Sequence, residues 1–107
     1  MSLTSDKKKH YRAIAHNLKP VLLIGDKGVS ESLVTELDRA LHDHELIKIK
    51  INPGDRDDRK RIIDDIICKS GAELVQSIGK TVVLFRKADK PDPGLSNILR
   101  NIQPKSG

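Results

Sequence analysis

The sequence predicts a single α/β domain in which helices pack on a four-stranded mixed sheet, in the order α-β-α-β-α-β-β. Three segments carry apolar residues at helical spacing, two short strand-like segments separate them, and two more strand-like segments follow across a glycine turn. A chain of 107 residues is long enough to bury a core unaided. We therefore expect a two-layer domain over residues 1–86, followed by a linker and C-terminal tail over 87–107.

The first helix is expected to begin at Thr4 or Ser5, either of which can cap it, and to stop before Pro20. Its inward face is an apolar stripe at helical spacing: Tyr11, Ile14, Ala15 and Leu18. Its other face is basic: Lys7, Lys8, Lys9 and Arg12. The segment 21–24 is wholly apolar and too short for a helix, which predicts a buried strand ending at Gly25.

A second helix is expected from Ser30, with Glu31 near its positive end and two histidines, His42 and His44, near its negative end. Its apolar stripe again follows helical spacing: Leu33, Val34, Leu37, Ala40 and Leu41. Residues 47–51 then alternate isoleucine with lysine, the period of a half-buried strand. Lys48 and Lys50 are therefore expected on an open face of the sheet.

Asp55 is expected to cap a third helix, which Gly71 closes in the left-handed conformation. Its inward row is Ile62, Ile63, Ile66 and Ile67, and we expect Cys68 in the same core. Residues 74–78 and 81–86 form a hairpin across Gly79-Lys80, a two-residue turn of type II′ or I′. The helix-linked strands should pair in parallel and the hairpin strands antiparallel.

The composition favours a soluble, moderately basic protein of a reducing compartment. Lys and Arg number 20 against 15 Asp and Glu, a formal charge of +5. The basic excess lies in residues 1–20 and 72–107, which the fold could bring together as one patch. A single cysteine excludes an internal disulfide and a zinc site built on cysteines. No apolar segment approaches the ~20 residues of a membrane span, and no signal peptide is expected, so we expect a cytoplasmic protein.

The most informative segment is Gly25-Asp26-Lys27-Gly28, a G-x-x-G loop between a strand and a helix. Glycines permit positive φ and a close approach of the backbone to a ligand. The first turn of the following helix offers free N–H groups and a favourable dipole to a negative group. In RNA-binding domains of the KH type such a loop clamps the sugar-phosphate backbone. By itself this spacing also occurs in a plain tight connection.

Three blocks of the sequence resemble the CRM domain, the chloroplast RNA splicing and ribosome maturation module, in its stand-alone bacterial YhbY form. They are residues 18–28, LKPVLLIGDKG; residues 44–50, HELIKIK; and residues 78–86, IGKTVVLFR. With the helices between them they extend from about residue 4 to residue 86. The resemblance implies an RNA-binding protein that associates with the precursor of the large ribosomal subunit. It also implies a fold similar to the C-terminal domain of translation initiation factor 3, and no catalytic residues.

The resemblance places the family's G-x-x-G loop on Gly25 and Gly28, with Lys27 as its cation. Asp26 departs from the family's basic or small polar residues, and its carboxylate would repel a phosphate unless it is neutralised or caps the helix. From the residues themselves we expect further RNA contacts from the cations outside the loop: Lys7, Lys8, Lys9, Arg12, Lys19, Lys48, Lys50, Lys80 and Arg86. Tyr11 and Phe85 are expected to pack inward, which leaves recognition through shape and backbone, with salt-sensitive and weakly sequence-specific binding.

The sequence offers little for functions other than RNA binding. The loop lacks the patterns of NTPases and dinucleotide-binding folds. His42 and His44 form an H-x-H pair, and three aspartates start the third helix, but helix-end electrostatics and surface pairing account for both. We therefore expect no enzyme, cofactor, metal, small-molecule substrate or membrane partner, and a monomer. The remaining alternative is a protein-interaction adaptor, because Leu95, Ile98, Leu99 and Ile102 could form a short amphipathic helix that docks on a partner.

Overall fold

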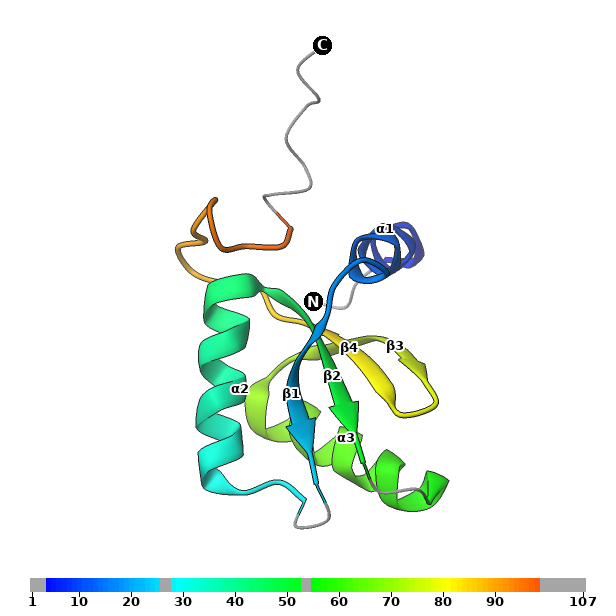
Figure 1. Ribbon diagram of the computed structural model, residues 1–107. Helices are drawn as coiled ribbons and strands as arrows, with labels where there is room; N and C mark the ends of the chain where they lie inside the picture. The colour runs from blue at the N-terminus through cyan, green and yellow to red at the C-terminus, as the bar shows by residue number, and fades with distance from the viewer. Residues whose placement is uncertain (1–3, 26–27, 53–54, 99–107) are drawn as a thin grey trace.

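The computed structural model describes residues 4–25, 28–52 and 55–98. Its elements follow the predicted order (Figure 1). They are α1 (Ser5–Ala15), β1 (Pro20–Ile24), α2 (Glu31–His44), β2 (Leu46–Ile51), α3 (Arg56–Ser70), β3 (Glu73–Ile78) and β4 (Thr81–Phe85). No helix among these described residues is both long enough and apolar enough to cross a membrane.

The four strands form one sheet in the order β1-β2-β4-β3. β1 pairs with β2 in parallel, while β2 with β4 and β3 with β4 are antiparallel. The predicted mixed sheet is therefore confirmed. The parallel pair is joined through α2, and the antiparallel pair through the turn at Gly79, where φ is +55° while Lys80 keeps a negative φ. That sign pattern is the type II′ alternative of the two predicted turns.

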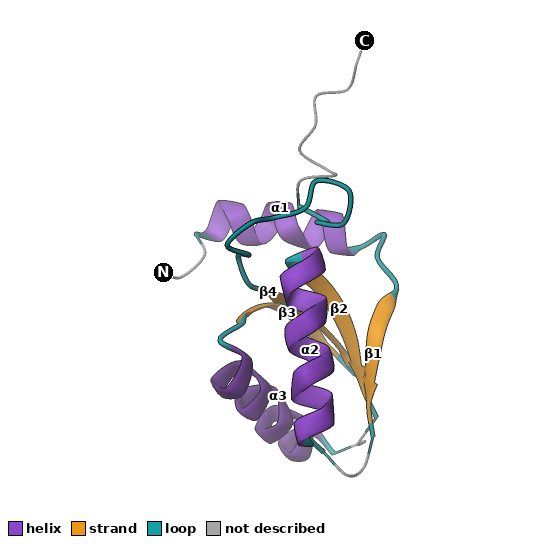
Figure 2. Ribbon diagram, turned by 90° about the vertical axis from the view of Figure 1, so that its left-hand side faces the viewer, coloured by secondary structure: helices purple, strands orange, loops and turns teal. Residues whose placement is uncertain are grey.

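One face of the sheet packs against α2 and α3 (Figure 2). The isoleucines of β2 lie in this core and are fully buried at positions 47, 49 and 51. Leu37 and Leu41 of α2 and Ile66 of α3 pack against them. The alternation of isoleucine and lysine along β2 predicted a strand with one buried face, and that face is the one covered by α2 and α3.

The opposite face carries a second core, which is an addition to the predicted two layers. Tyr11, Ile14 and Ala15 of α1 pack on Leu46 and Val83, two residues that point away from α2 and α3. α1 therefore crosses one end of the other face, on the far side of the sheet from α2 (Figure 1). Three residues of the predicted stripe lie on α1, whereas Leu18 follows the end of the helix at Ala15 and packs against the same core from the connection to β1. A helical stripe does not specify which face of a sheet it will cover.

The N-terminal ends of the three helices and the C-terminal end of α3 form as the sequence predicts. The hydroxyl of Thr4 accepts from the N–H of Lys7 at 3.2 Å, and the hydroxyl of Ser30 accepts from the N–H of Leu33 at 3.1 Å. Asp55 caps α3, and Gly71 closes it with φ +73°. Each cap satisfies backbone groups that a helix end would otherwise leave without a partner.

Two burial predictions are wrong. β1 is an edge strand with one open face, so Val21 is 45% and Leu23 63% exposed, and only Ile24 is fully buried from this strand. A short apolar segment cannot distinguish an interior strand from an edge strand. Cys68 is exposed on α3 rather than in the core, because it follows Ile66 and Ile67 around the helix and turns away from the sheet.

Residues 87–98, which we call the C-terminal strap, fold back onto the domain instead of leaving it as a linker. Ser96 donates to the carboxylate of Glu45 at 2.6 Å, and the N–H of Ala88 donates to its other oxygen at 2.9 Å. Glu45 is only 4% exposed and has φ +61°. Asn97 donates to the carbonyl of Leu46 at 2.7 Å. The strap is therefore held at the junction of α2 and β2.

The helix predicted around residues 95–102 is not formed in residues 95–98, which make turns, and the remainder lies outside the described residues. Ile98 is 6% exposed and packs beneath α1 with Tyr11. Ile98, one of the apolar residues expected to dock on a protein partner, is therefore part of the protein's own core.

Candidate nucleic-acid interface

The half of the second sheet face that α1 leaves uncovered is open. Leu23, Lys50, Thr81 and Ile78 are direct cross-strand partners and form one row over all four strands. Direct partners in a sheet share a face. Leu23 and Ile78 are each 63% exposed. The row therefore presents a lysine on β2 with an exposed apolar side chain at each edge of the sheet.

Lys48 lies one step closer to α1 on the same face. Its partner Val83 is 2% exposed because α1 covers it, whereas Lys48 is half-buried. The lysine stem can lie on the sheet while its ammonium reaches solvent. The predicted open face with Lys48 and Lys50 is confirmed, and α1 marks its upper limit.

The G-x-x-G loop lies at the other end of this face, directly after β1. The N–H of Gly28 donates to the carbonyl of Gly25 at 3.1 Å, which closes a turn, and Gly28 has φ +74°. No atom lies within 4 Å of a Cβ built at either glycine. Asp26 and Lys27 lie outside the described residues. Both glycines are therefore open to a ligand, and Gly28 also has a conformation that favours glycine.

Backbone hydrogen bonds fix the loop to its neighbours. Asn52, just after β2, donates from its N–H to the carbonyl of Ile24 at 2.8 Å. On the other side, Ser30 caps α2 two residues after Gly28. The first turn of α2 carries Glu31, whose carboxylate already complements the helix dipole. Hydrogen bonds of the described residues thus anchor the segments on both sides of the loop.

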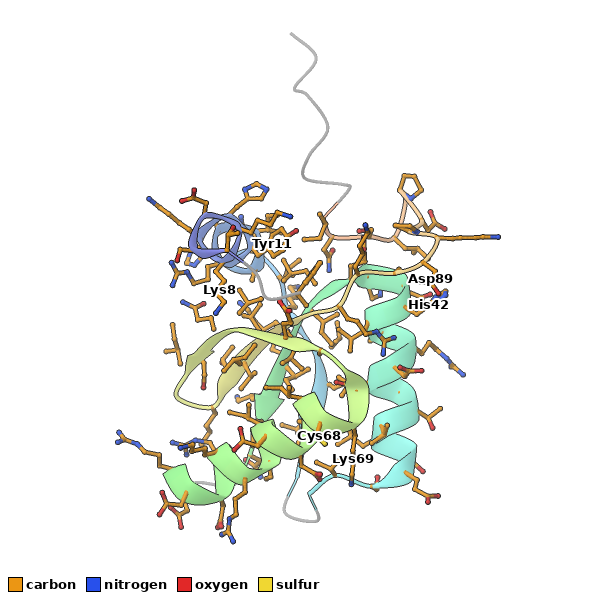
Figure 3. The ribbon with its side chains drawn as sticks, turned by 180° about the vertical axis from the view of Figure 1, so that it is seen from behind. Lys8, Tyr11, His42, Cys68, Lys69 and Asp89 are labelled. Atoms are coloured by element: carbon orange, nitrogen blue, oxygen red, sulfur yellow. The ribbon has the colours of Figure 1, made fainter. Side chains whose placement is uncertain are left out.

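The predicted cations do not form one cluster. Those of α1 lie at the opposite end of the molecule from the G-x-x-G loop, as Figure 3 shows for Lys8 and Tyr11. Lys8 is half-buried. Around the helix Lys7 lies about 40°, Lys8 about 60° and Arg12 about 100° from Tyr11, whereas Lys9 lies about 160° from it. Lys9 therefore points away from the sheet.

Other predicted cations are brought together on or beside the open face. Lys19 and Lys48 line one recess of 190 Å³, together with Val21, His44 and Asn97. Asn97 belongs to the C-terminal strap, so the strap reaches the edge of the candidate interface. Lys80 lies in the hairpin turn that joins Ile78 to Thr81, two members of the exposed row. The cations thus extend along the face from α1 to the hairpin.

Arg86 is engaged inside the protein. Its guanidinium donates to the carboxylate and the carbonyl of Asp38 on α2, and to the carbonyl of Ser70 at the end of α3 at 2.9 Å. Its side chain is 25% exposed. This arginine joins α2, α3 and β4, and we therefore leave it out of the interface proposed below.

Tyr11 and Phe85, the chain's single tyrosine and single phenylalanine, pack together with ring centroids 4.8 Å apart. Tyr11 is 8% exposed. Burial, and secondarily the negative charge of Glu45, raise the pKa of the Tyr11 phenol above its ordinary value. Tyr11 is therefore a neutral core residue, and the open face has no tyrosine, phenylalanine or tryptophan on which a base could stack.

The H-x-H histidines have separate partners. Nδ1 of His44 lies 2.9 Å from the carbonyl of Leu95 in the strap, and Nδ1 of His42 lies 3.5 Å from the carboxylate of Asp43. Over residues 4–25, 28–52 and 55–98, no group of three or more His, Cys, Asp or Glu side chains could hold a metal ion. His44 thus contacts the C-terminal strap, and His42 contacts its neighbour at the end of α2.

Sequence reasoning missed two features of this surface. The expected burial of β1 hid Leu23, and the unknown strand order hid Ile78 of β3, the two exposed side chains at the ends of the row. Sequence reasoning also discounted the cations of α3 as paired with aspartates. The spacing of Arg56, Arg59 and Lys60, three and four residues apart, was the signal that they share a face.

Comparison with known proteins agrees with this geometry. The CRS1/YhbY (CRM) domain family matches residues 3–86. The chain belongs to the CRM domain family. The match spans α1 to β4, so the open face and the G-x-x-G loop of this CRM domain lie wholly within it, whereas the strap begins after its last residue.

Relatives of this CRM domain protein are named for RNA binding. A Pseudomonas aeruginosa protein named "Probable RNA-binding protein" is 48% identical over 100 residues, 94% of this chain and 96% of the relative. A Haemophilus influenzae protein named "RNA-binding protein" is 36% identical over 83% of this chain and 90% of its own length. Both names describe binding rather than catalysis.

The fold is also found in a solved structure, the solution structure of a hypothetical protein of Staphylococcus aureus. It superposes with a TM-score of 0.73 at 32% identity, and covers 83% of this chain and 93% of its own. The predicted mixed α/β architecture is thus shared by an independently solved protein.

Proposed function

We propose that this protein binds RNA through the sugar-phosphate backbone, along the open face of its sheet. One observation carries the proposal: the exposed row of Leu23, Lys50, Thr81 and Ile78 lies on the same face as Lys48 and ends beside the G-x-x-G loop. A strand of RNA lying along β2 would meet Lys48 and Lys50 in succession. The RNA-binding names of the relatives support the same class of ligand.

The mode of binding follows from the side chains on this face. Lysines bind phosphates as point charges, and the exposed aliphatic side chains of Leu23 and Ile78 can contact sugars and base faces without hydrogen bonding to base edges. With the aromatic pair inside the core, stacking contributes little. We therefore expect weak sequence preference and strong dependence on salt.

In this proposal the G-x-x-G loop contacts the backbone of the RNA at the lower end of the face. Gly25 and Gly28 have open space where a Cβ would lie, so a phosphate group can approach the main chain. Lys27 is the proposed cation of the loop, and Asp26 reduces its net charge. Lys27→Ala should weaken binding modestly for every RNA tested, because it removes one phosphate contact.

As the natural target we propose ribosomal RNA in a precursor of the large ribosomal subunit, following the family resemblance. Crosslinking in cells, followed by sequencing of the attached RNA, tests this target. We expect the reads to concentrate on large-subunit ribosomal RNA. Reads spread evenly over messenger RNA would overturn the target while leaving RNA binding intact.

The binding mode is tested by filter-binding titrations over a salt series. Each phosphate contact contributes about 0.7 to 0.9 to the slope of log affinity against log salt. The double variant Lys48→Gln/Lys50→Gln should lower that slope by about 1.5. Lys69→Gln is the matched control, because Lys69 lies on α3 and pairs with Asp65 at 3.2 Å.

An unchanged slope in a folded Lys48/Lys50 variant would show that RNA does not lie on this face. Copurification after nuclease treatment provides a separate test of the protein class. An RNA binder loses its bound cargo on nuclease treatment, whereas a protein adaptor keeps its partner. Retention of a protein partner would favour the adaptor function.

A further inference from the structure

A second cationic surface lies on the opposite side of the hairpin, between α3 and β3. The two elements enclose a groove of 420 Å³. Its α3 wall is a continuous helical stripe: Arg56, Arg59, Lys60, Ile63 and Asp64. Its β3 wall consists of Leu74 and Ser77 and ends at Gly79 of the hairpin turn. Positions three, four, seven and eight residues apart lie on one helix face, so these α3 side chains point into one groove.

The residues that line the groove carry a net positive charge. The groove holds three cationic side chains and one carboxylate, that of Asp64. Asp55 caps α3 by accepting from the N–H of Asp57 at 3.0 Å. Asp58 pairs with Arg61, and Asp65 with Lys69, both away from the groove-lining stripe. Positive potential is thus concentrated on the one face of α3 that borders β3.

The shape of the groove suits an extended chain. Ile63, only 8% exposed, and Leu74 form its apolar floor. β3 is an edge strand of the sheet, so nothing in the sheet order closes the groove on that side. Ser77 and Gly79 line its end at the hairpin turn. A polyanionic chain could lie between the arginines and this strand edge.

The groove and the open face share the hairpin as a common rim. Ser77 lines the groove, the adjacent Ile78 lies in the exposed row on the other face, and Gly79 lines the groove again. The N–H of Ile51 donates to the carbonyl of Lys80 at 2.7 Å, which fixes the turn to the end of β2. Figure 1 shows the hairpin turn directly above the N-terminal half of α3. A chain that leaves the open face at Lys80 can therefore enter the groove.

We infer that the α3–β3 groove is a second phosphate-binding surface, and that bound RNA continues from the open face around the hairpin turn into it. The inference rests on the proposed function. The ligand class is the phosphodiester backbone of RNA, recognised by Arg56, Arg59 and Lys60, since arginine forks match phosphate oxygens. An acidic protein segment would suit the charge, but only a polynucleotide suits the continuity with the lysines of the open face.

The test compares four proteins in filter-binding titrations over a salt series, with a duplex hairpin RNA and with poly(U). They are the wild type, the groove variant Arg56→Gln/Lys60→Gln, the open-face variant Lys48→Gln/Lys50→Gln, and the control Arg61→Gln. Arg61 is an exposed cation of the same helix outside the groove stripe and is paired with Asp58. Circular dichroism and urea midpoints establish that each variant is folded.

We expect the groove variant to lose two phosphate contacts, which lowers the slope of log affinity against log salt by about 1.4 to 1.8 and weakens RNA binding several-fold. Arg61→Gln should change neither the slope nor the affinity. If only the open-face variant weakens binding, the proposed function stands and the groove inference is wrong. If only the groove variant weakens binding, the groove binds RNA by itself, and both the open-face proposal and the continuous path around the hairpin are wrong. Polyglutamate, titrated in the same way, represents an acidic protein segment. If the groove variant keeps its RNA affinity but loses binding to polyglutamate, the groove holds an acidic protein and the inference is overturned.

Discussion

The two loop glycines provide a matched pair of substitutions, Gly25→Ala and Gly28→Ala. Both positions have open space around an added Cβ. Only Gly28 has a positive φ, +74°. Any difference in stability between the two variants therefore reports the backbone conformation and not a steric clash.

The expected magnitudes follow from that difference. A non-glycine residue in the left-handed region costs about 1 to 2 kcal/mol. Replacing glycine by alanine also lowers the entropy of the unfolded chain, which stabilises the protein by about 0.4 to 1 kcal/mol. Gly28→Ala should therefore lower the free energy of unfolding by roughly 1 kcal/mol, whereas Gly25→Ala should leave it unchanged or raise it slightly.

The same two variants separate stability from binding. Gly25→Ala places a methyl group where the proposal brings a phosphate close to the main chain, so it should weaken RNA binding in a protein that is no less stable. Urea denaturation and filter binding measure the two quantities on the same samples. Equal stability of the two variants would refute the left-handed conformation at Gly28. Unchanged RNA affinity in both would refute contact between the loop and RNA.

Further predictions concern the core and the surface. Arg86→Ala should destabilise the protein by about 2 kcal/mol in urea denaturation, because it breaks the ion pair with Asp38 and leaves the Ser70 carbonyl at the end of α3 without this donor. Arg86→Lys should not restore the stability, since lysine lacks the planar fork. Ile98→Ala should cost roughly 2 kcal/mol in the same assay if the strap belongs to the core; no loss would show that the strap is dispensable. Because the folded state raises the pKa of Tyr11, the folded form keeps that proton when the unfolded chain loses it, and stability should fall above about pH 10. Tyr11→Phe should reduce this fall in melting temperature. Native Cys68 should react with a thiol reagent as fast as in urea, and protection from the reagent would contradict its exposure.

Local features of this fold were predictable because their causes are local. Ser30 caps α2, Asp55 caps α3, and Gly71 closes α3 at the positions the sequence indicates, since capping depends on side chains within a few residues. The alternation of isoleucine and lysine along β2 also predicted which lysines would face away from α2 and α3. A strand has a period of two residues, so this assignment requires no knowledge of the partner strands.

The errors that concern the open face of the sheet have one cause: the sequence does not give the order of the strands. A short apolar segment predicts a strand but not whether neighbours cover both of its faces, so Leu23 was expected inside and is exposed at an edge. The same missing information hid the exposed row in which Leu23 pairs with Lys50. The face covered by α1 was equally undetermined, because a helical stripe can pack on either side of a sheet.

The sequence by itself determined which segments between residues 5 and 85 form helices and strands, and the mixed type of the sheet. The tertiary structure alone decided which cations share a surface: it separated Lys8 from the G-x-x-G loop, placed Arg86 inside the protein, and grouped Arg56 with Lys60 beside the hairpin. Helix and strand periods act over a few residues, whereas an electrostatic surface is built from residues distant in the chain. Only the packing of the sheet between its helices brings those residues together.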